Sequence, residues 1–240
     1  LAGLAVAIGF RAGLFNIGAE GQMTIGGMTA VMAGFMITGV PWIIHLPIAI
    51  LAGFVGGAIW GGIPGWLRAR TGAHEVISTI MLNFIAYRLV DWLLKRPAII
   101  REGRFDPVSK DIEPTARFPQ LLDWIDPALR LHGGFLLALF MAWVTWWVLF
   151  RSSVGFEFRA VGSNPDAATY AGMSVTMATV VVMAFSGGLA GLAGASVTLG
   201  VLGSVSPGFT AGVGFDAIAL ALLGRSHPGG VVLAGLLFGA

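Results

Sequence analysis

The stretch MSVTMATVVVMAFSGGLAGLAGASVTLGVLGSVSPGFTAGVGF, residues 173–215, contains no charged side chain. One helical crossing of a bilayer needs about 20 apolar residues, so the stretch is about twice as long as a single crossing. Glycines recur along it, and Pro207 interrupts its second half. We therefore expect a membrane span that ends near Gly200, a break at GSVSPGFTAGVG (residues 203–214) and a short helix at FDAIALALLG (residues 215–224).

The rest of the chain has the same character. Of its 240 residues, 56% are hydrophobic and only 11% are charged, and the mean hydropathy is +0.85. Further apolar runs occupy residues 23–40, 41–67, 76–94 and 133–150. They do not alternate between apolar and polar residues as barrel strands do, and only helices or closed barrels satisfy their backbone in lipid. We predict an all-α, polytopic helical membrane protein with glycine-rich broken helices.

Charge and cysteine content limit the kinds of site and partner that this chain can have. The chain has no cysteine, which excludes disulfides and thiolate metal sites. Its net charge of +2 is better explained by residues that flank membrane spans than by a nucleic-acid surface, so we expect contact with membrane lipid and no nucleic-acid partner. The chain opens on Leu1 and stops inside an apolar stretch, so we expect one transmembrane domain, residues 1–240, that is a fragment at both ends.

A second break carries a charge. The motif FNIGAEGQM, residues 15–23, places Glu20 among glycines in an apolar setting. Charges inside a membrane tend to face a bundle interior or a water-filled path. Two roles that do not exclude each other can be assigned to Glu20: it lies in a broken helix that lines a translocation path, and it caps a helix that begins at Gln22. Asp216 follows the other break in the same way, and two such segments leave open an inverted repeat.

Glycines also recur at strict four-residue spacing at Gly53, Gly57, Gly61 and Gly65. Such a stripe lets another helix approach closely. We expect the stripe to pack within its own bundle rather than to form a dimerisation face.

Sequence motifs give no indication of an enzyme. HEVIS at residues 74–78 lacks the second histidine of a zinc helix, and GVGFDA at residues 212–217 has no βαβ unit around it. Neither lysine follows a glycine, so no phosphate-binding loop is present. The histidines are scattered. We predict no catalytic residues, no metal and no cofactor.

The polar segment of residues 151–172 predicts one short helix. Asn164 suits an N-cap, Pro165 the first helical position and Asp166 the first turn, while Gly172 suits a left-handed C-terminus. A helix of about two turns is not stable by itself. It therefore needs a surface on which to dock, and we expect Ala167, Ala168 and Ala171 to offer a small-residue face for it.

This segment also carries a family resemblance. DAATYAG, residues 166–172, resembles the E-A-A-x-x-x-G motif of ABC importer permeases, with aspartate in place of glutamate. Its context FRAVGSNPDAATYAGM resembles the branch that transports branched-chain amino acids, simple sugars and nucleosides. FRAGLFNIGAEGQM, EVISTIMLNFIA and IALALLGRSHPGG are most similar to the purine and nucleoside permeases of that branch.

The resemblance implies a permease that works with other subunits. Its short helix would couple to a separate ATP-binding cassette ATPase, an extracytoplasmic solute-binding protein would deliver a nucleoside or simple sugar, and a second permease subunit, identical or a sister chain, would complete the path. The protein would lie in the cell (inner) membrane. The coupling residues would be Asn164, Pro165, Asp166, Ala167, Ala168 and Gly172. Besides Glu20 and Gln22, we expect Asn16 and Asn83 to belong to the substrate path, because polar groups in apolar helices need partners. For Asn83 the alternative is a packing hydrogen bond between helices.

The orientation follows from the resemblance and not from charge. Residues 95–132 would form an extracytoplasmic loop and residues 151–172 the cytoplasmic coupling segment. Lysines and arginines are more frequent in the first of these, so the positive-inside rule favours the opposite orientation.

An ion-coupled secondary transporter or a channel, working through Glu20 and Asp216, is the alternative function.

Overall fold

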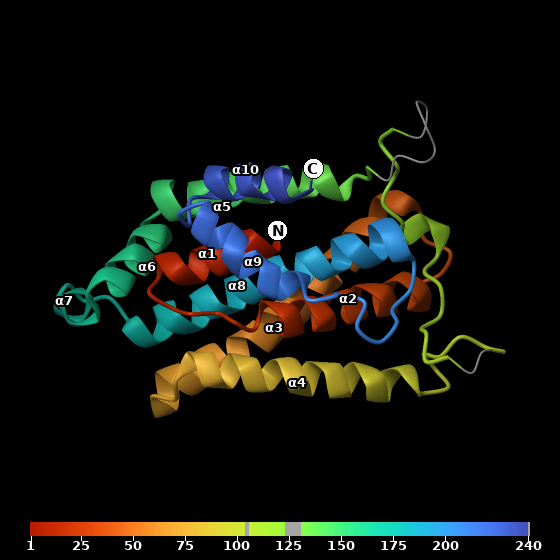
Figure 1. Ribbon diagram of the computed structural model, residues 1–240, viewed down its shortest axis with the longest axis horizontal. Coiled ribbons are helices and arrows are strands. Elements are labelled where there is room, and N and C mark those ends of the chain that lie inside the picture. Colours follow the sequence, from red (N-terminus) through yellow and green to blue (C-terminus); the bar gives the residue numbers. More distant parts are fainter. Residues whose placement is uncertain (104–105, 123–130, 240) are drawn as a thin grey trace.

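The computed structural model describes residues 1–103, 106–122 and 131–239, and the protein is helical through most of them (Figure 1). In these ranges there is no strand, only two isolated backbone bridges, Ile100 with Ser109 and Gln120 with His132. The prediction of an all-α fold is confirmed. The helices are α1 (Ala2–Arg11), α2 (Ala19–Met36), α3 (Trp42–Thr71), α4 (Glu75–Leu94), the 3-10 turn η1 (Pro114–Ala116), α5 (Gly134–Arg151), α6 (Ser153–Ser163), α7 (Pro165–Tyr170), α8 (Val175–Val197) with the π-helical turn η2 (Thr198–Leu202), α9 (Val213–Leu223) and α10 (Pro228–Gly239).

Four of these helices are long and apolar enough to cross a membrane: α3, α4, α5, and α8 together with η2. Large apolar side chains are exposed on their outer faces, among them Ile59, Phe84 and Trp143. Polar side chains such as Gln22 and Asn83 are buried instead. This inverted distribution is expected for a bundle surrounded by lipid, and the chain is a multi-pass membrane protein.

The glycine stripe of α3 packs against α8, as expected. A Cβ atom at Gly57 would lie 2.3 Å from the carbonyl oxygen of Gly187, and one at Gly191 would lie 2.2 Å from the carbonyl oxygen of Gly53. No side chain fits at such distances, so the two backbones touch directly. The bare surfaces on both helices hold α3 and α8 together inside one chain.

Helix α2 occupies the centre of the bundle. It packs against α3, α8, α4 and α9, and most of its residues up to Gly34 are buried. The sequence pattern predicted a span over residues 23–40, but the helix begins earlier, at Ala19, and ends at Met36. It reaches the centre because glycines on its surface leave room: a Cβ at Gly26 would lie 2.2 Å from Gly191 Cα.

The predicted break in the long apolar stretch is present. Helix α8 and η2 end at Leu202, an irregular segment follows, and α9 begins at Val213. With 11 residues, α9 is about 16 Å long, roughly half of the 30 Å hydrocarbon core. A second irregular segment, residues 12–18, separates α1 from α2. Whether the two halves form an inverted repeat stays a prediction.

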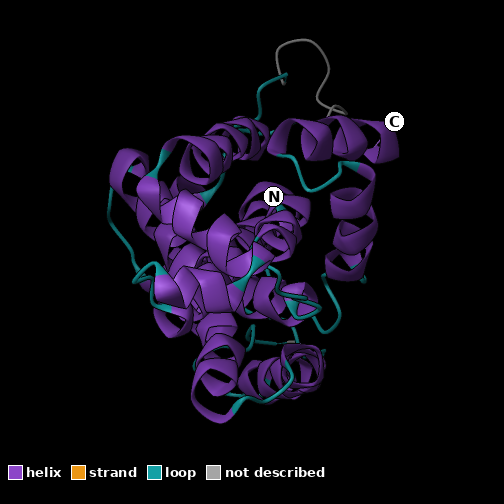
Figure 2. Ribbon diagram, turned by 90° about the vertical axis from the view of Figure 1, so that its left-hand side faces the viewer, coloured by secondary structure: helices purple, strands orange, loops and turns teal. Residues whose placement is uncertain are grey.

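The two polar segments lie at opposite ends of the bundle. Figure 1 shows α6 and α7 at the left end and the segment after α4 at the right end. The loop predicted over residues 95–132 includes residues 104–105 and 123–130, which lie outside the described ranges. Figure 2, seen from the end that carries α7, shows the start of α1 among the other helices, which agrees with the burial of Ala2–Gly9.

Candidate functional site

Buried polar side chains gather where α2 begins. Asn16, in the break before α2, donates from Nδ2 to Gln22 Oε1 at 2.9 Å and to Ser186 Oγ of α8 at 2.8 Å. The Ser186 hydroxyl in turn donates to the carbonyl oxygen of Ala5 at 2.6 Å. Asn16 Oδ1 accepts from the Gly18 N–H at 2.9 Å. The network therefore joins α1, the break, α2 and α8.

Asn83 connects the same point to α4. Its Oδ1 accepts from the Gly21 N–H at 2.9 Å, and its Nδ2 donates to the carbonyl oxygen of Ile17 at 3.0 Å. The Gly21 N–H belongs to the first turn of α2 and has no acceptor within the helix. Asn83 thus supplies a hydrogen bond that the helix start lacks.

Glu20 makes the third connection, to α9. Its Oε1 accepts from the Gly212 N–H at 3.1 Å and from the Thr210 hydroxyl, and its Oε2 accepts from the Gly214 N–H at 2.6 Å. Gly212 is the N-cap of α9. The carboxylate therefore neutralises the positive end of α9.

The expectation that Glu20 caps its own helix is wrong. The helix begins at Ala19 with Gly18 as N-cap, and the side chains that accept from N–H groups at its start are those of Asn16 and Asn83, not that of Glu20. Glu20 lies one residue inside the helix, and its side chain points across to α9. It can do so because Gly214 lacks a side chain: a Cβ there would lie 2.4 Å from Glu20 Cα.

The cluster lies at mid-depth in the bundle. Asn83 is near the midpoint of α4, and Ser186 is near the midpoint of α8. The far end of α9 reaches the end of the bundle that carries α6, where Arg11 Nε donates to the carbonyl oxygen of Ser226 at 2.9 Å and His227 stacks on Phe150. Because α9 is about half a membrane long, its start is also at mid-depth.

The structure brings together all four residues that sequence reasoning placed in the substrate path. Asn16, Glu20, Gln22 and Asn83 are each at most 2% exposed. Every one of them is hydrogen-bonded to other parts of this chain. Sequence reasoning missed their partners, Ser186 and Thr210, because isolated hydroxyl residues in apolar stretches carry no recognisable motif.

Asp216, the other acid that follows a break, behaves differently. It lies in the first turn of α9 and is exposed, as is its neighbour Phe215. No hydrogen bond or ion pair of its carboxylate is found among the described residues. The expectation of one buried acid per break therefore holds for Glu20 and is wrong for Asp216.

The break before α2 is also tied to the junction of α3 and α4. The Phe15 N–H donates to Glu75 Oε1 at 3.3 Å, and the other oxygen of Glu75 pairs with Arg68. Glu75 is buried although it carries a charge. Glu75, paired with Arg68, therefore anchors the break through Phe15 at the end that carries α7.

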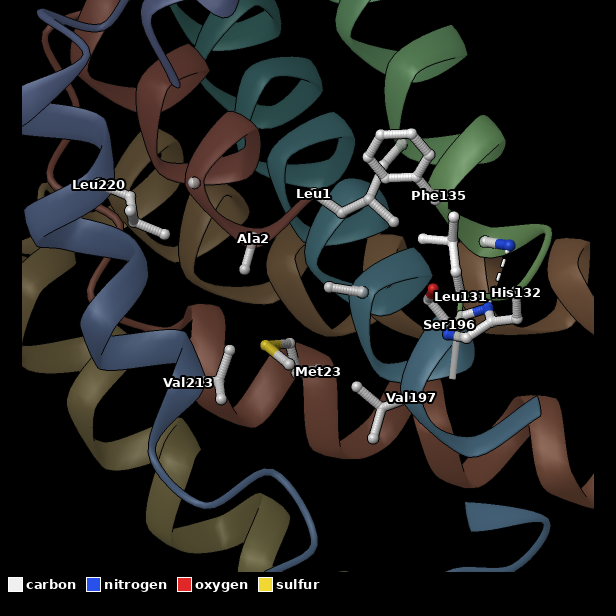
Figure 3. A pocket seen from close by; sticks show the side chains of 14 residues that line it. Leu1, Ala2, Met23, Leu131, His132, Phe135, Ser196, Val197, Val213 and Leu220 are labelled. Atoms are coloured by element: carbon white, nitrogen blue, oxygen red, sulfur yellow. Dashed lines mark hydrogen bonds between the residues drawn. The ribbon is translucent and has the colours of Figure 1, made fainter. Parts of the chain in front are cut away.

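A cavity of about 330 Å³ opens between α1, α2, α5, α8 and α9 (Figure 3). Apolar side chains such as Met23 and Phe135 line most of it, and His132 and Ser196 provide polar groups at one end. The Gly134 N–H donates to His132 Nδ1 at 3.1 Å, and burial lowers the pKa of the His132 imidazole below its usual value. None of the four predicted path residues lines this cavity.

At one end of the bundle, the expected short helix is present as α7. The Ala167 N–H donates to Asn164 Oδ1 at 3.0 Å, so Asn164 is the N-cap, and Gly172 has a φ of +81°. Two features differ from expectation. A further helix, α6, precedes α7, and Ala168 is buried against its own chain. Ala168 therefore cannot belong to an open small-residue face.

The open face of α7 has other members. Asp166, Thr169 and Tyr170 line a shallow hollow, and Tyr170 is 95% exposed. Ala167 and Ala171 are exposed beside them. Tyrosine is one of the residue types enriched where proteins bind one another.

Comparison with known proteins identifies relatives over the whole chain. The family model described as "Branched-chain amino acid transport system / permease component" matches residues 1–240. The guanosine ABC transporter permease protein NupP of Bacillus subtilis is 45% identical over 100% of this chain and 68% of its own length. A glucose ABC transporter permease protein of Haloferax volcanii is 38% identical over 99% of this chain and 64% of its own length.

A third relative is a nucleoside ABC transporter permease protein, NupB, of Lactococcus lactis subsp. cremoris, which is 34% identical over 99% of this chain and 66% of its own length. The chain thus spans roughly two thirds of the length of these relatives. No solved structure matches it.

Proposed function

The chain belongs to the family of permease components of branched-chain amino acid transport systems, and we propose that it is the membrane-spanning subunit of an ATP-binding cassette importer for a nucleoside or a simple sugar. The named functions of its relatives, guanosine, glucose and nucleoside permeases, support this substrate range. Its place would be the cell membrane. ATP hydrolysis would occur on a separate subunit.

The observation that carries the proposal is the geometry of α7. This helix is capped by Asn164, ends at Gly172 and presents Tyr170 at 95% exposure. It lies at the end of the bundle opposite the long segment that follows α4 (Figure 1). A protruding, prefolded helix between two membrane spans is suited to transmit the motion of an ATPase, because it moves with both spans.

The docking face differs from the one that the sequence indicated. We propose that Asp166, Thr169 and Tyr170 contact the ATPase, while Ala168 holds α7 on its own chain. Asn164, Pro165 and Gly172 would set the start and the end of the helix, and Ala167 would lie beside the contact. An extracytoplasmic solute-binding protein would then meet the opposite end, and a second permease subunit would complete the translocation path.

The polar cluster supports a path at mid-depth. We propose that Asn16, Gln22 and Asn83 hold the broken segments beside this path, and that Glu20 fixes the start of α9. Buried polar groups joined in one hydrogen-bond network give a rigid framework. Such a framework is suited to hold two half-length segments in register while the subunits move.

A docking experiment tests the proposal. Tyr170→Ala should leave the permease in the membrane but weaken its co-purification with the ATPase, and ATP-dependent uptake should fall at least tenfold. Met177→Ala is the matched control, because Met177 is also exposed, at 62%, but lies within α8. Equal ATPase recovery and equal uptake in both variants would contradict the proposed coupling role of α7.

Labelling tests the orientation. Because the chain has no cysteine, single cysteines at Glu102 and Ser163 can be probed with an impermeant reagent on intact cells. Both positions are exposed. Ser109, in contrast, is buried, with its hydroxyl accepting from the Val205 N–H at 2.8 Å, and is a poor probe. We expect labelling at position 102 only; labelling at position 163 only would reverse the orientation.

A further inference from the structure

We infer that Asp216 faces the translocation path and recognises hydroxyl or amino groups of a neutral solute. This inference rests on the proposed transport function and names the residue that would select its substrate class. It differs from the interpretation of Glu20 as the path carboxylate, because the carboxylate of Glu20 is already occupied by Thr210, Gly212 and Gly214.

Asp216 lies at nearly the same depth in the bundle as Glu20. Gly214 N–H is bonded to Glu20 at the centre of the bundle, and Asp216 is only two residues further along α9. One helical residue adds about 1.5 Å, so Asp216 is within a few ångströms of the same depth. An ionised carboxylate at that depth is costly in contact with hydrocarbon and is typically found facing a water-filled path or a bundle interior.

Asp216 belongs to the exposed side of α9. Asp216 lies outside the hydrogen-bond network that occupies the polar side chains around it, and it is exposed. Gly214 and Ala217 lie on the buried side of α9, which faces α1 and α2. The exposed side continues from Phe215 and Asp216 to Ala219 and Leu222, and it is therefore a continuous face of the half-length helix.

A carboxylate of this chain already occupies the start of α9. In transporters with broken helices, the positive start of a half-length helix commonly binds an anionic group of the substrate. Here Glu20 fills that position at the start of α9, and Asn83 and Asn16 satisfy N–H groups at the start of α2. These N–H groups are therefore already bonded, and Asp216 adds a further negative charge beside them.

These steps define the ligand chemistry. A carboxylate accepts hydrogen bonds and repels phosphate or carboxylate groups. The exposed ring of Phe215 beside it, 43% exposed, offers an apolar surface for a base or for the C–H face of a sugar. The arrangement fits a neutral, hydroxyl-bearing solute and excludes its phosphorylated form.

Two measurements test the inference. In the cysteine-free chain, Asp216→Cys should react with a small, charged methanethiosulfonate reagent in membranes, whereas Ala217→Cys, on the buried side of the same turn, should not. In complexes assembled with the ATPase and the solute-binding protein, Asp216→Asn should raise the KM for guanosine or glucose at least tenfold. ATPase co-purification should be unchanged, and Asp216→Leu should abolish uptake.

The outcomes separate this inference from the proposed function. If the parent complex transports neither guanosine nor glucose with ATP, the proposed function fails, while the thiol reaction still reports whether position 216 faces water. An unreactive cysteine at position 216 means that lipid or another segment covers this face, and the inference is overturned. Normal KM values in both Asp216 variants, with the parent active, overturn it as well.

Discussion

Removing the carboxylate of Glu20 should detach α9 from α2. In Glu20→Ala, the N–H groups of Gly212 and Gly214 lose their acceptor, and the Thr210 hydroxyl loses a charged partner. A buried donor left without an acceptor costs about 1–3 kcal/mol. The Gly214 N–H is buried and the Gly212 N–H is only part-buried, so the two together cost roughly 2–4 kcal/mol. The Thr210 hydroxyl can rotate towards another acceptor, and we therefore leave it out of this sum.

Glu20→Gln separates shape from charge. The amide keeps one acceptor oxygen, but its NH2 group must face one of the backbone N–H groups, so about one donor remains unsatisfied at a cost of roughly 1–3 kcal/mol. Gly214→Ala should detach the same contact from the other side, since its Cβ would lie 2.4 Å from Glu20 Cα. We therefore expect Glu20→Ala to destabilise the protein more than Glu20→Gln does.

The assay is the free energy of unfolding in detergent, with hydrogen exchange of the segment 208–216 as a local readout. Glu102→Gln removes an exposed carboxylate and is the matched control, with an expected effect of about 0.5 kcal/mol or less. The segment 208–216 should exchange faster in the Glu20 variants only. Unfolding free energies equal to that of the control, with unchanged exchange, would refute the role of Glu20 as the partner of α9.

Three other perturbations test the remaining parts of the account. Gly57→Ala should destabilise the bundle by about 1–3 kcal/mol, because its Cβ meets the α8 backbone. Gly62→Ala should not destabilise it, because the Cβ there would have its nearest neighbour at 3.7 Å. Equal thermal midpoints for the two variants would contradict the glycine contact. Gly172→Val should cost about 1–2 kcal/mol of backbone strain and reduce ATPase recovery in pull-downs, whereas Gly172→Asn, which tolerates a positive φ, should retain it; identical recovery in the two variants would count against a coupling role. Because burial lowers the pKa of His132, the folded state resists protonation, and stability should fall as the pH drops below the unfolded pKa of about 6.5. His132→Gln should flatten this part of the profile of thermal midpoint against pH. An unchanged profile would contradict the assignment of this pH dependence to His132.

Much of the fold could be predicted from the sequence, because long runs of apolar residues mark the membrane spans. The uncharged stretch 173–215 predicted α8, the break and α9 closely, since glycines, a proline and excess length permit no single helix there. The four-residue glycine spacing in α3 likewise predicted a close contact. Its partner on α8 could not be derived, because glycines occur on several helices and the sequence does not say which backbones meet.

The residues of the buried polar cluster could be selected from the sequence, but their hydrogen-bond partners could not. Polar residues in apolar surroundings must find partners, which is why Asn16, Gln22 and Asn83 could be selected from the sequence. The partners of Glu20 lie 190 or more residues away along the chain, and local reasoning could offer only a path role or a cap on the nearest helix start. Likewise, α7 was predictable from its cap residues, but the burial of Ala168 depends on α6 and α8.

The central claim is that this chain forms the path of an ATP-driven importer, and the most direct test is uptake by the reconstituted complex. Proteoliposomes that contain the permease, its ATPase, the solute-binding protein and any second permease should accumulate guanosine or glucose when ATP is supplied. Accumulation should persist when ionophores collapse the sodium and proton gradients. Uptake that proceeds without the ATPase and ceases with the ion gradients would contradict the claim and establish the ion-coupled alternative.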